Sequence, residues 1–293
     1  MNLEDYDISN KITARVIDSH PLTSTEASEE IKEITLEIQD SSFDVHIGQS
    51  IAIIIQGPHE FGHQHHIRLY TIAGKLQSKE GKYTLILICV KRINYLDEYS
   101  GELQQGIASN YLCNLANEAT VEIAGPYGLP FKVPTDKTSN FVLIGLGTGI
   151  APFRAFVKHL YEDIGDWQGE IRLYYGARSG LESVYLNDER DDFSQYYDKE
   201  TFNAFKALSP RPAWNDPIAF DQILLHHQQR VWDLINNPKT YVYLAGFHDI
   251  EENLEKCFVT MAGSEDLWLK TKSDLIKENR WVELSYGLHG SIA

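Results

Sequence analysis

The chain has 293 residues, of which 43% are hydrophobic, and its 42 acidic and 26 basic residues give a formal net charge of −16. This length favours two domains, and the negative charge argues against nucleic acid or an anionic membrane as the partner. No apolar run approaches the roughly 20 residues of a membrane-spanning helix, so we expect a cytoplasmic protein without membrane insertion. Cys89, Cys113 and Cys257 are too few for a four-cysteine iron–sulfur cluster, so any electron transfer requires an organic cofactor.

Short β-rich runs occupy the sequence up to about residue 136, separated by glycine, proline and polar turns. Such runs predict a small antiparallel β-barrel. The runs are 14–22, 31–38, 50–56, 67–74, 82–93 and 119–128.

Within the same half, residues 62–96 carry six basic residues against one acidic residue, a local excess of +5. A basic surface on an acidic protein would suit an acidic partner or a phosphate ligand, although scattered solvated lysines explain it equally well. We define the basic strip as the residues Lys75, Lys79, Lys82, Lys91 and Arg92.

Strands and helices alternate in the second half, which predicts a doubly wound α/β domain with a parallel sheet. Strands are expected at 140–147, 170–178 and 240–246, and helices from 152, at 223–235 and at 249–262. Polar residues and a proline interrupt both patterns at 132–140, so the domains are expected to be 1–136 and 137–293.

A glycine turn joins the strand at 140–147 to the following helix in "IGLGTGIAPFR". Its glycines are Gly145, Gly147 and Gly149, and Ile150 occupies the position where the usual dinucleotide fingerprint has its third glycine. Glycine permits close approach to a ligand, and the free N–H groups of a helix start favour an anion. A tight turn without a ligand is the alternative.

Two segments of the first half also suit a dinucleotide. Alternation in "RLYT" places Arg68 and Tyr70 on one face, where a flavin dinucleotide can use the cation and the ring while Thr71 bonds the flavin edge. An exposed Arg–Tyr pair is the plainer alternative. The segment "GIASNYLCNL", with Gly106 and Ser109, reads as a second helix start able to bind a phosphate.

The motifs "RLYT", "CVKRINY", "GIASNYLCNL", "AGPYG" and "GTGIAPFR", in this order, resemble the plant-type ferredoxin–NADP reductase family over nearly the whole chain. The resemblance implies an N-terminal β-barrel that binds FAD and a C-terminal α/β domain that binds NADP(H). It also implies hydride exchange between NADP(H) and the flavin, and single-electron exchange with ferredoxin or flavodoxin.

The same resemblance implies the site residues. Arg68, Tyr70 and Thr71 would hold FAD, Tyr95 would stack on its adenine, and 106–109 would cradle its pyrophosphate. Ser109 would also place a hydroxyl beside the reacting flavin and nicotinamide. The full cofactor-binding set is Arg68, Tyr70, Thr71, Cys89, Lys91, Tyr95, Gly106, Ala108 and Ser109 for FAD, and Gly147, Thr148, Gly149, Ser209, Arg211, Gln222 and Gly246 for NADP(H), with Tyr286 on the flavin.

The catalytic residues expected from the resemblance are Tyr70, Ser109 and Tyr286. Tyr286 would lie on the flavin face and swing aside for nicotinamide, with Trp281 as a competitor for that role. The chain then continues for seven residues, "GLHGSIA", unlike the plant enzymes.

Two further departures concern the reaction. Ala245 stands where the family usually carries a cysteine before Gly246, and the glutamate expected at Leu284 stands instead at Glu283. A slower or differently gated hydride step is therefore expected. Neither departure forbids the step, because the flavin itself carries the chemistry.

The coenzyme's 2′-phosphate needs cationic or hydroxyl partners. "LSPRP" offers Ser209 and Arg211, and Arg178 is a second candidate cation. Downstream, Phe220 is expected to stack on the coenzyme and Gln222 to hydrogen-bond it, but the family's lysine is missing. NADP is favoured over NAD by a small margin.

Two polar clusters are expected to have no ligand. His59, His63, His65 and His66 lie in a loop before a strand, where a fixed metal geometry is not expected. The acidic run 187–193 is expected to be a solvated loop.

Two alternative functions remain open at this level. One is the NAD(P)H-oxidising reductase component of an oxygenase system. The other is a flavin-binding subunit without turnover, suggested by Ala245 and the displaced glutamate.

Overall fold

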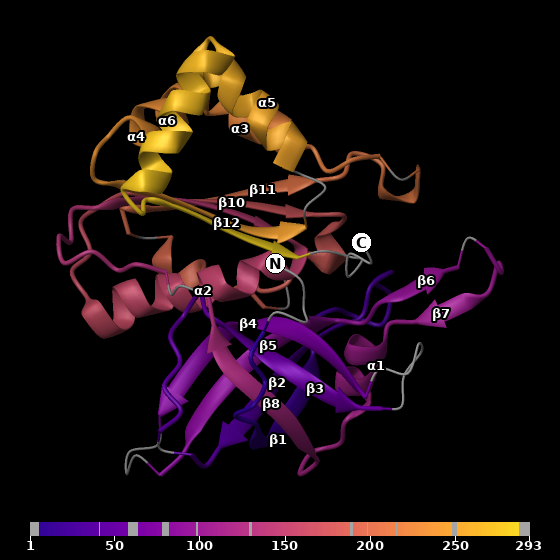
Figure 1. Ribbon diagram of the computed structural model, residues 1–293. Helices are drawn as coiled ribbons and strands as arrows, with labels where there is room; N and C mark the ends of the chain where they lie inside the picture. The colour runs from indigo at the N-terminus through magenta and orange to yellow at the C-terminus, as the bar shows by residue number, and fades with distance from the viewer. Residues whose placement is uncertain are drawn as a thin grey trace. The chain divides into compact units, whose positions relative to one another are not determined.

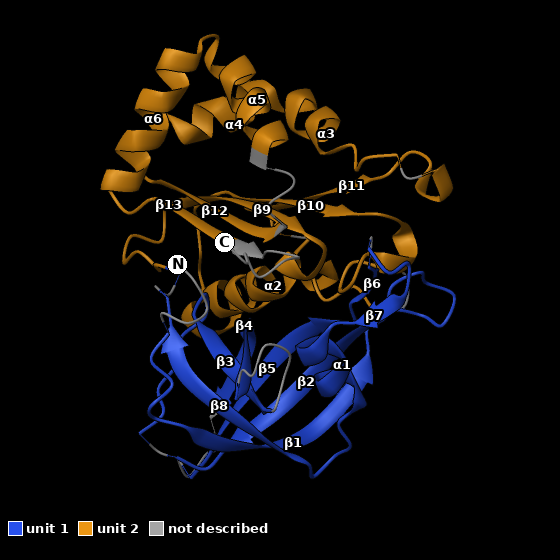
Figure 2. Cartoon of the chain, turned by 45° about the vertical axis from the view of Figure 1, so that its right-hand side comes forward, with its two compact units in different colours: residues 1–131, 290–293 blue, residues 132–289 orange. Residues whose placement is uncertain are grey.

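The computed structural model describes residues 6–40, 42–57, 64–77, 82–97, 99–128, 131–187, 190–197, 199–214, 216–247 and 251–286. The chain forms two compact units, residues 1–131 with 290–293, and residues 132–289 (Figure 2). Each unit has a hydrophobic core of its own.

The first unit is a closed antiparallel barrel, which confirms the fold expected from the short β-rich runs. Within the described residues its strand order is β1-β2-β5-β4-β3-β8 (Figure 1). The strands are β1 (Ile12–Pro21), β2 (Ile31–Ile38), β3 (Ser50–Gln56), β4 (His65–Gln77), β5 (Thr84–Lys91) and β8 (Thr120–Tyr127).

Strict alternation in β5 shows why the sheet closes around one core. Ile86, Ile88 and Val90 are fully buried inside the barrel, while the residues between them are half-buried on the outer face. A period of two places one apolar side of each strand inward. The inner side chains of all six strands therefore form one continuous core.

A short hairpin and a helix follow β5 in the first unit. The hairpin consists of β6 (Asn94–Leu96) and β7 (Leu103–Gln105), and α1 (Ile107–Asn114) begins directly after it (Figure 1). Helix α1 packs on β4 and β5, and Leu112 and Cys113 enter the barrel core.

The second unit is built on a parallel sheet in the order β11-β10-β9-β12-β13. Its strands are β9 (Asn140–Leu146), β10 (Ile171–Ala177), β11 (Phe202–Leu208), β12 (Thr240–Phe247) and β13 (Trp281–Tyr286). Strands of a parallel sheet are covered on both faces and are therefore apolar throughout, as the fully buried run 141–144 of β9 illustrates.

Helices cover both faces of this sheet (Figure 1). One face carries α2 (Ile150–Lys158), which the π-helical turn η4 (His159–Ile164) extends. The other carries α3 (Phe220–His226), α4 (Gln228–Ile235), α5 (Glu251–Ala262) and α6 (Glu265–Lys277). This arrangement confirms the doubly wound α/β domain, and no helix in the described parts of the chain is long and apolar enough to cross a membrane.

The helices of the second unit differ from expectation in two places. The single helix expected at 223–235 is two helices, because the backbone leaves the helical region at His227, with φ −103° and ψ 16°. Helix α6 and β13 were not among the expected elements. Strand β13 forms the edge of the sheet beside β12, and its Trp281 packs against Phe258 and Trp268.

The described residues of the acidic run, 187 and 190–193, do not form a solvated loop, so that expectation was wrong for them. The guanidinium groups of Arg154 and Arg190 both bond the half-buried carboxylate of Asp192, and both lie over the ring of Tyr185, at 4.5 and 5.0 Å from its centroid. Phe193 is fully buried. Burial would raise the pKa of Asp192, but the hydrogen bond from Arg190 and the two nearby positive charges hold it below its ordinary value.

Replacing Asp192 with asparagine should lower the free energy of unfolding by about 1–3 kcal/mol at pH 7, because it leaves two guanidinium groups short of a charged acceptor. The pKa of Asp192 is lowered in the folded state, so its contribution is present above the unfolded-state pKa and disappears as the pH falls through the folded-state pKa. Urea unfolding should therefore show the variant and the parent converging in acid. Asp163→Asn, at an exposed pair with His159, is the control. A D192N difference that persists unchanged in acid would contradict this account.

Candidate functional site

A candidate phosphate site in the first unit lies at the start of α1, where Gly106 is the residue before the helix. The Gly106 N–H donates to the Ile93 carbonyl (2.8 Å), and the Ile93 N–H donates to the Ser109 hydroxyl oxygen (3.1 Å). The Ser109 hydroxyl in turn donates to the Gly106 carbonyl (3.3 Å). These bonds hold the start of the helix against the chain that follows β5.

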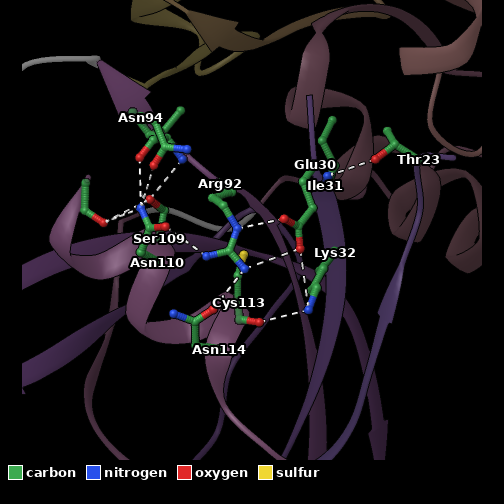
Figure 3. Close-up of polar contacts among 12 residues, drawn as sticks. Thr23, Glu30, Ile31, Lys32, Arg92, Asn94, Ser109, Asn110, Cys113 and Asn114 are labelled. Atoms are coloured by element: carbon green, nitrogen blue, oxygen red, sulfur yellow. Dashed lines mark hydrogen bonds and ion pairs between the residues drawn. The ribbon is translucent and has the colours of Figure 1, made fainter. Parts of the chain in front are cut away.

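Two side chains extend this network (Figure 3). The buried amide of Asn110 donates to the carbonyls of Ile93 (2.9 Å) and Gly106 (3.0 Å) and accepts from Arg92 (2.8 Å). Arg92 also donates to the carboxylate of Glu30 (2.7 Å), the residue directly before β2. The helix start is therefore held by backbone and side-chain bonds together.

The geometry at Gly106 explains the glycine in the motif. A Cβ there would lie 3.0 Å from Ser109 Oγ and 3.1 Å from the Ile93 carbonyl, tighter than most real contacts. No side chain caps the first turn of α1, and free N–H groups at a helix start favour an anion. These residues fit a pyrophosphate, with Ala108 in the same turn.

The bonds of Ser109 give it a structural role that the sequence did not show. Its hydroxyl is buried and bonded to the backbone on both sides. Its expected place beside a reacting flavin and nicotinamide stays a prediction.

Arg68 and Tyr70 share the inner face of β4, as alternation predicts. Tyr70 packs against the barrel core, whereas Leu69 packs on the opposite face. Burial raises the pKa of Tyr70, so the phenol stays neutral at physiological pH. No carboxylate in the described parts of the chain pairs with Arg68, so its guanidinium can receive a phosphate. The neighbouring Thr71 hydroxyl lies 3.1 Å from that of Ser50.

The remaining expected FAD residues are more scattered. Cys89 and Lys91 lie on the outer face of β5, opposite the core-facing Ile88 and Val90, and Lys91 pairs with Glu29. Tyr95 on β6 is about half exposed, with its ring accessible in the hairpin. Their contacts with a cofactor remain predictions.

Three of the five residues of the basic strip pair with acids from other parts of the chain. Asp44 pairs with Lys75 (2.7 Å), Glu29 pairs with Lys91, and Glu30 pairs with Arg92 (2.7 Å). Lys79 lies outside the described residues. The excess of charge is therefore smaller in space than along residues 62–96, since the three carboxylates that meet these cations lie outside that window.

The candidate site of the second unit lies at the carboxyl ends of its parallel strands. After β9 the chain runs to β10 and β11 on one side and returns to β12 and β13 on the other, so the strand order reverses between β9 and β12. Ligands of doubly wound sheets bind at such a reversal. Gly147, Thr148 and Gly149 form the 3₁₀ turn η3 (Gly147–Gly149) there, directly before α2.

Glycine is needed at each of three positions near this reversal, for a different reason at each. Gly147 has a positive φ of 55°, which favours glycine. A Cβ on Gly149 would lie 2.1 Å from the Ala245 carbonyl oxygen, so the turn packs directly on the end of β12. Gly246 combines a φ of 150° with a Cβ position 2.7 Å from Leu146. The start of α2 has no side-chain cap, but its Ile150 N–H donates to the Gly147 and Thr148 carbonyls, and Pro152 has no N–H. A phosphate here would depend on the glycine turn, which allows its close approach.

The residues expected at the 2′-phosphate come together beyond β11. The Arg178 guanidinium donates to the Pro212 carbonyl (2.9 Å), and the Ser209 N–H donates to the Arg178 carbonyl (3.3 Å). Arg211 lies in the same loop, and Gln222 is exposed on α3. Trp214, three-quarters exposed in the turn η7 (Pro212–Trp214), is an aromatic residue that the sequence analysis missed.

Two expected aromatic roles are wrong. Phe220 is a core residue whose ring would lie 2.6 Å from a Cβ on Gly176, so it has no open face for a coenzyme. Trp281 is buried with Phe258 and Trp268 and cannot compete for the flavin.

At the carboxyl end of β13, Tyr286 pairs with Phe247 through the backbone, and its side chain lies outside the described residues, as does the tail after it. Glu283, the displaced glutamate, shares the face of Trp281, whose indole it accepts from at 2.5 Å, and pairs with Lys272 at 3.1 Å. These bonds hold the Glu283 side chain on the face of the sheet that α6 covers.

The histidines were expected to hold no metal. His59 and His63 lie outside the described residues, and neighbouring His65 and His66 point to opposite faces of β4 by alternation. The described chain brings together no group of three or more His, Cys, Asp or Glu side chains suited to a metal.

Comparison with known proteins matches each unit to a family. Residues 21–131 match the model of the oxidoreductase FAD-binding domain, and residues 143–256 match that of the oxidoreductase NAD-binding domain.

Comparisons along most of the chain agree with the two family matches. Ferredoxin–NADP reductase of Synechocystis sp. is 28% identical over 278 residues, covering 93% of this chain and 67% of the relative. The cyanelle ferredoxin–NADP reductase of Cyanophora paradoxa is 30% identical over 245 residues, covering 82% of this chain and 67% of the relative. The chain spans about two thirds of the length of these relatives. Among solved structures, ferredoxin–NADP⁺ reductase of Plasmodium falciparum with 2′P-AMP superposes with a TM-score of 0.71 at 22% identity, covering 98% of this chain and 99% of that one.

Asn110→Ala should lower the free energy of unfolding by about 1–3 kcal/mol, because it removes buried bonds to two carbonyls and to Arg92. Urea unfolding measures the loss. Asn114→Ala is the matched control, since Asn114 is exposed and also accepts from Arg92, at 3.0 Å. Equal effects of the two substitutions would show that the network does not hold the helix start.

Gly149→Ala should destabilise the chain by about 3 kcal/mol, because the new methyl group collides with the backbone of Ala245. The φ of Gly149, −62°, is compatible with alanine, so the effect would be purely steric. Thermal and urea unfolding measure it. Gly180→Ala, whose Cβ would meet nothing within 4 Å, should change stability by less than about 0.5 kcal/mol.

Proposed function

We propose that this chain, which belongs to the ferredoxin–NADP reductase family, is an FAD-dependent oxidoreductase that exchanges hydride with NADP(H) and single electrons with a ferredoxin or flavodoxin. The observation that carries the proposal is that each unit has a helix start that follows a glycine and has no side-chain cap, at Gly106 and at Gly149. Two such sites suit two dinucleotides, and the matched FAD-binding and NAD-binding families divide between the same two units.

In the first unit the residues support a flavin dinucleotide. The start of α1 and the unpaired Arg68 would hold the pyrophosphate, and the neutral Tyr70 and Thr71 lie next to Arg68 on β4. The exposed ring of Tyr95 offers a stacking surface for adenine. FAD, when bound, supplies hydride exchange with nicotinamide and single-electron exchange with a carrier.

In the second unit the residues support a nicotinamide dinucleotide. The 3₁₀ turn at 147–149 and the start of α2 would hold its pyrophosphate, and the loop beyond β11 would hold its adenosine end. Ala245, buried beneath the turn, brings no thiol to the nicotinamide. At this position the chain therefore contributes packing under the turn and no side-chain chemistry.

Three finer assignments belong to the same proposal. Ferredoxin is the partner named for the relatives, and flavodoxin is a second carrier of the same one-electron chemistry. The functional domains are proposed as 1–136 and 137–293. A cytoplasmic location also remains a prediction.

A flavin-binding subunit without turnover is the alternative that one observation favours. Leu284 stands where the family has its glutamate, and the neighbouring Glu283 is bonded to Trp281 and Lys272 instead. Flavin reduction by coenzyme separates the two functions.

The test is to purify the protein with its flavin and mix it anaerobically with NADPH and, separately, NADH in a stopped-flow instrument. Rapid bleaching of the flavin absorbance by either coenzyme, followed by reoxidation on addition of ferredoxin, is the expected result. A yellow protein that neither coenzyme bleaches would favour the subunit without turnover.

Arg68→Gln tests the cofactor assignment in the same preparation. It should lower the flavin content of the purified protein about tenfold, because it removes a cation that would pair with the pyrophosphate. Arg15→Gln, which breaks surface pairs with Glu37 and Glu118, is the control. A colourless parent protein, or equal flavin content in both variants, would contradict the assignment.

A further inference from the structure

The loop that follows β11 is closed on itself by Asp216. The Ser209 hydroxyl donates to the Asp216 carbonyl (2.7 Å), and the Asp216 N–H donates to the Arg211 carbonyl (3.4 Å). The Arg211 guanidinium donates to both carboxylate oxygens, at 2.7 and 3.5 Å. One aspartate therefore engages both of the groups that the sequence offers to a 2′-phosphate.

This arrangement has a direct chemical consequence for the coenzyme. A phosphate group accepts hydrogen bonds and needs donors, but the single hydroxyl proton of Ser209 and the nearest N–H groups of Arg211 are already donated to Asp216. The carboxylate also repels a second anion. A ribose 2′-hydroxyl, by contrast, can donate to a carboxylate, as it does in many NAD sites.

We infer that Asp216 is a specificity-determining residue that lowers this chain's discrimination between NADP(H) and NAD(H). Asp216 holds Arg211 in an ion pair when the 2′-position carries a hydroxyl, and Arg211 must leave that pair to meet a 2′-phosphate. The inference rests on the proposed function, because it concerns the coenzyme of the same site.

The strength of the pair sets the size of the effect. The Arg211 side chain is 61% exposed and that of Asp216 is 23% exposed. Ion pairs this accessible are weak, so a 2′-phosphate can displace the carboxylate at a modest loss of affinity. Both coenzymes are therefore accepted. The preference between them depends on how strongly Arg211 binds a 2′-phosphate compared with the Asp216 carboxylate.

Trp214 completes the cluster as the surface for adenine. Phe220, the downstream aromatic expected to stack, is buried in the core. The Trp214 indole is exposed and lies beside the Arg211 guanidinium, 5.1 Å from ring centroid to guanidinium carbon. Stacking on adenine is common to both coenzymes, so Trp214 contributes affinity without selecting between them.

The experiment measures binding of 2′-phospho-AMP and 5′-AMP to the flavin-loaded protein by calorimetry, together with kcat/KM for NADPH and NADH with ferricyanide as the electron acceptor. Asp216→Asn should tighten 2′-phospho-AMP about three- to tenfold and leave 5′-AMP unchanged or slightly weaker. The NADPH-to-NADH ratio of kcat/KM should rise by a similar factor. Arg211→Gln should weaken only 2′-phospho-AMP.

Two variants serve as controls. Asp233→Asn removes an equal charge on α4, where Gln229 bonds the carboxylate, and should leave both ligands unchanged. Trp214→Ala should weaken both ligands by the same factor, about fivefold.

The outcomes separate this inference from the proposed function. If the parent flavin is bleached by coenzyme but Asp216→Asn changes both ligands equally or neither, the inference fails and the proposed function stands. If neither coenzyme bleaches the flavin, the proposed function fails. A parent protein that binds neither nucleotide fragment would overturn the inference as well.

Discussion

The contact between the turn at Gly149 and the Ala245 carbonyl determines the geometry of the second unit. Space for a Cβ is missing there by more than an ångström, because the position lies 2.1 Å from the carbonyl oxygen. The parallel register aligns Gly145 with Ala245, so β9 and β12 end side by side. Without the close approach, α2 could not begin directly above the reversal of strand order, where doubly wound sheets bind ligands.

The barrel reaches a similar result by different means. Gly106 also permits a close approach, but its neighbours are polar: Ser109 and Asn110 bond the chain at Ile93, and Arg92 fixes Asn110. A buried network of this kind orients its members only when each is satisfied. The first helix start is thus held by hydrogen bonds and the second by packing, although neither has a side-chain cap.

The sequence predicts the architecture well because the strongest signals are local. Alternation in 84–91 and the continuous apolar run 141–144 specify strands with one and two buried faces, and the glycine turns mark where helices begin. Helix α6 and β13 are missed, since their burial depends on each other: Trp268 and Trp281 pack together only once both elements are in place. The break at His227 falls within the polar run 226–230, which contains no proline or glycine to mark it.

Side-chain roles are harder to predict, because partners distant in sequence decide them. Phe220 has the right residue type for stacking, but the glycine at 176 admits its ring into the core. The cations at Lys75, Lys91 and Arg92 look like an open surface until Asp44, Glu29 and Glu30 are seen beside them.

The same reasoning applies to Arg211, whose charge the sequence assigns to a phosphate. Asp216 lies five residues further on, beyond Pro212 and Trp214, and only the folded loop shows that the two side chains meet. A count of charges along the chain treats each cation as available for a ligand. Binding of the ligand depends instead on the difference in interaction free energy between the cation's present partner and the incoming ligand. Where the present partner is a weakly held carboxylate, that difference is small, and selectivity for an anionic ligand is small with it.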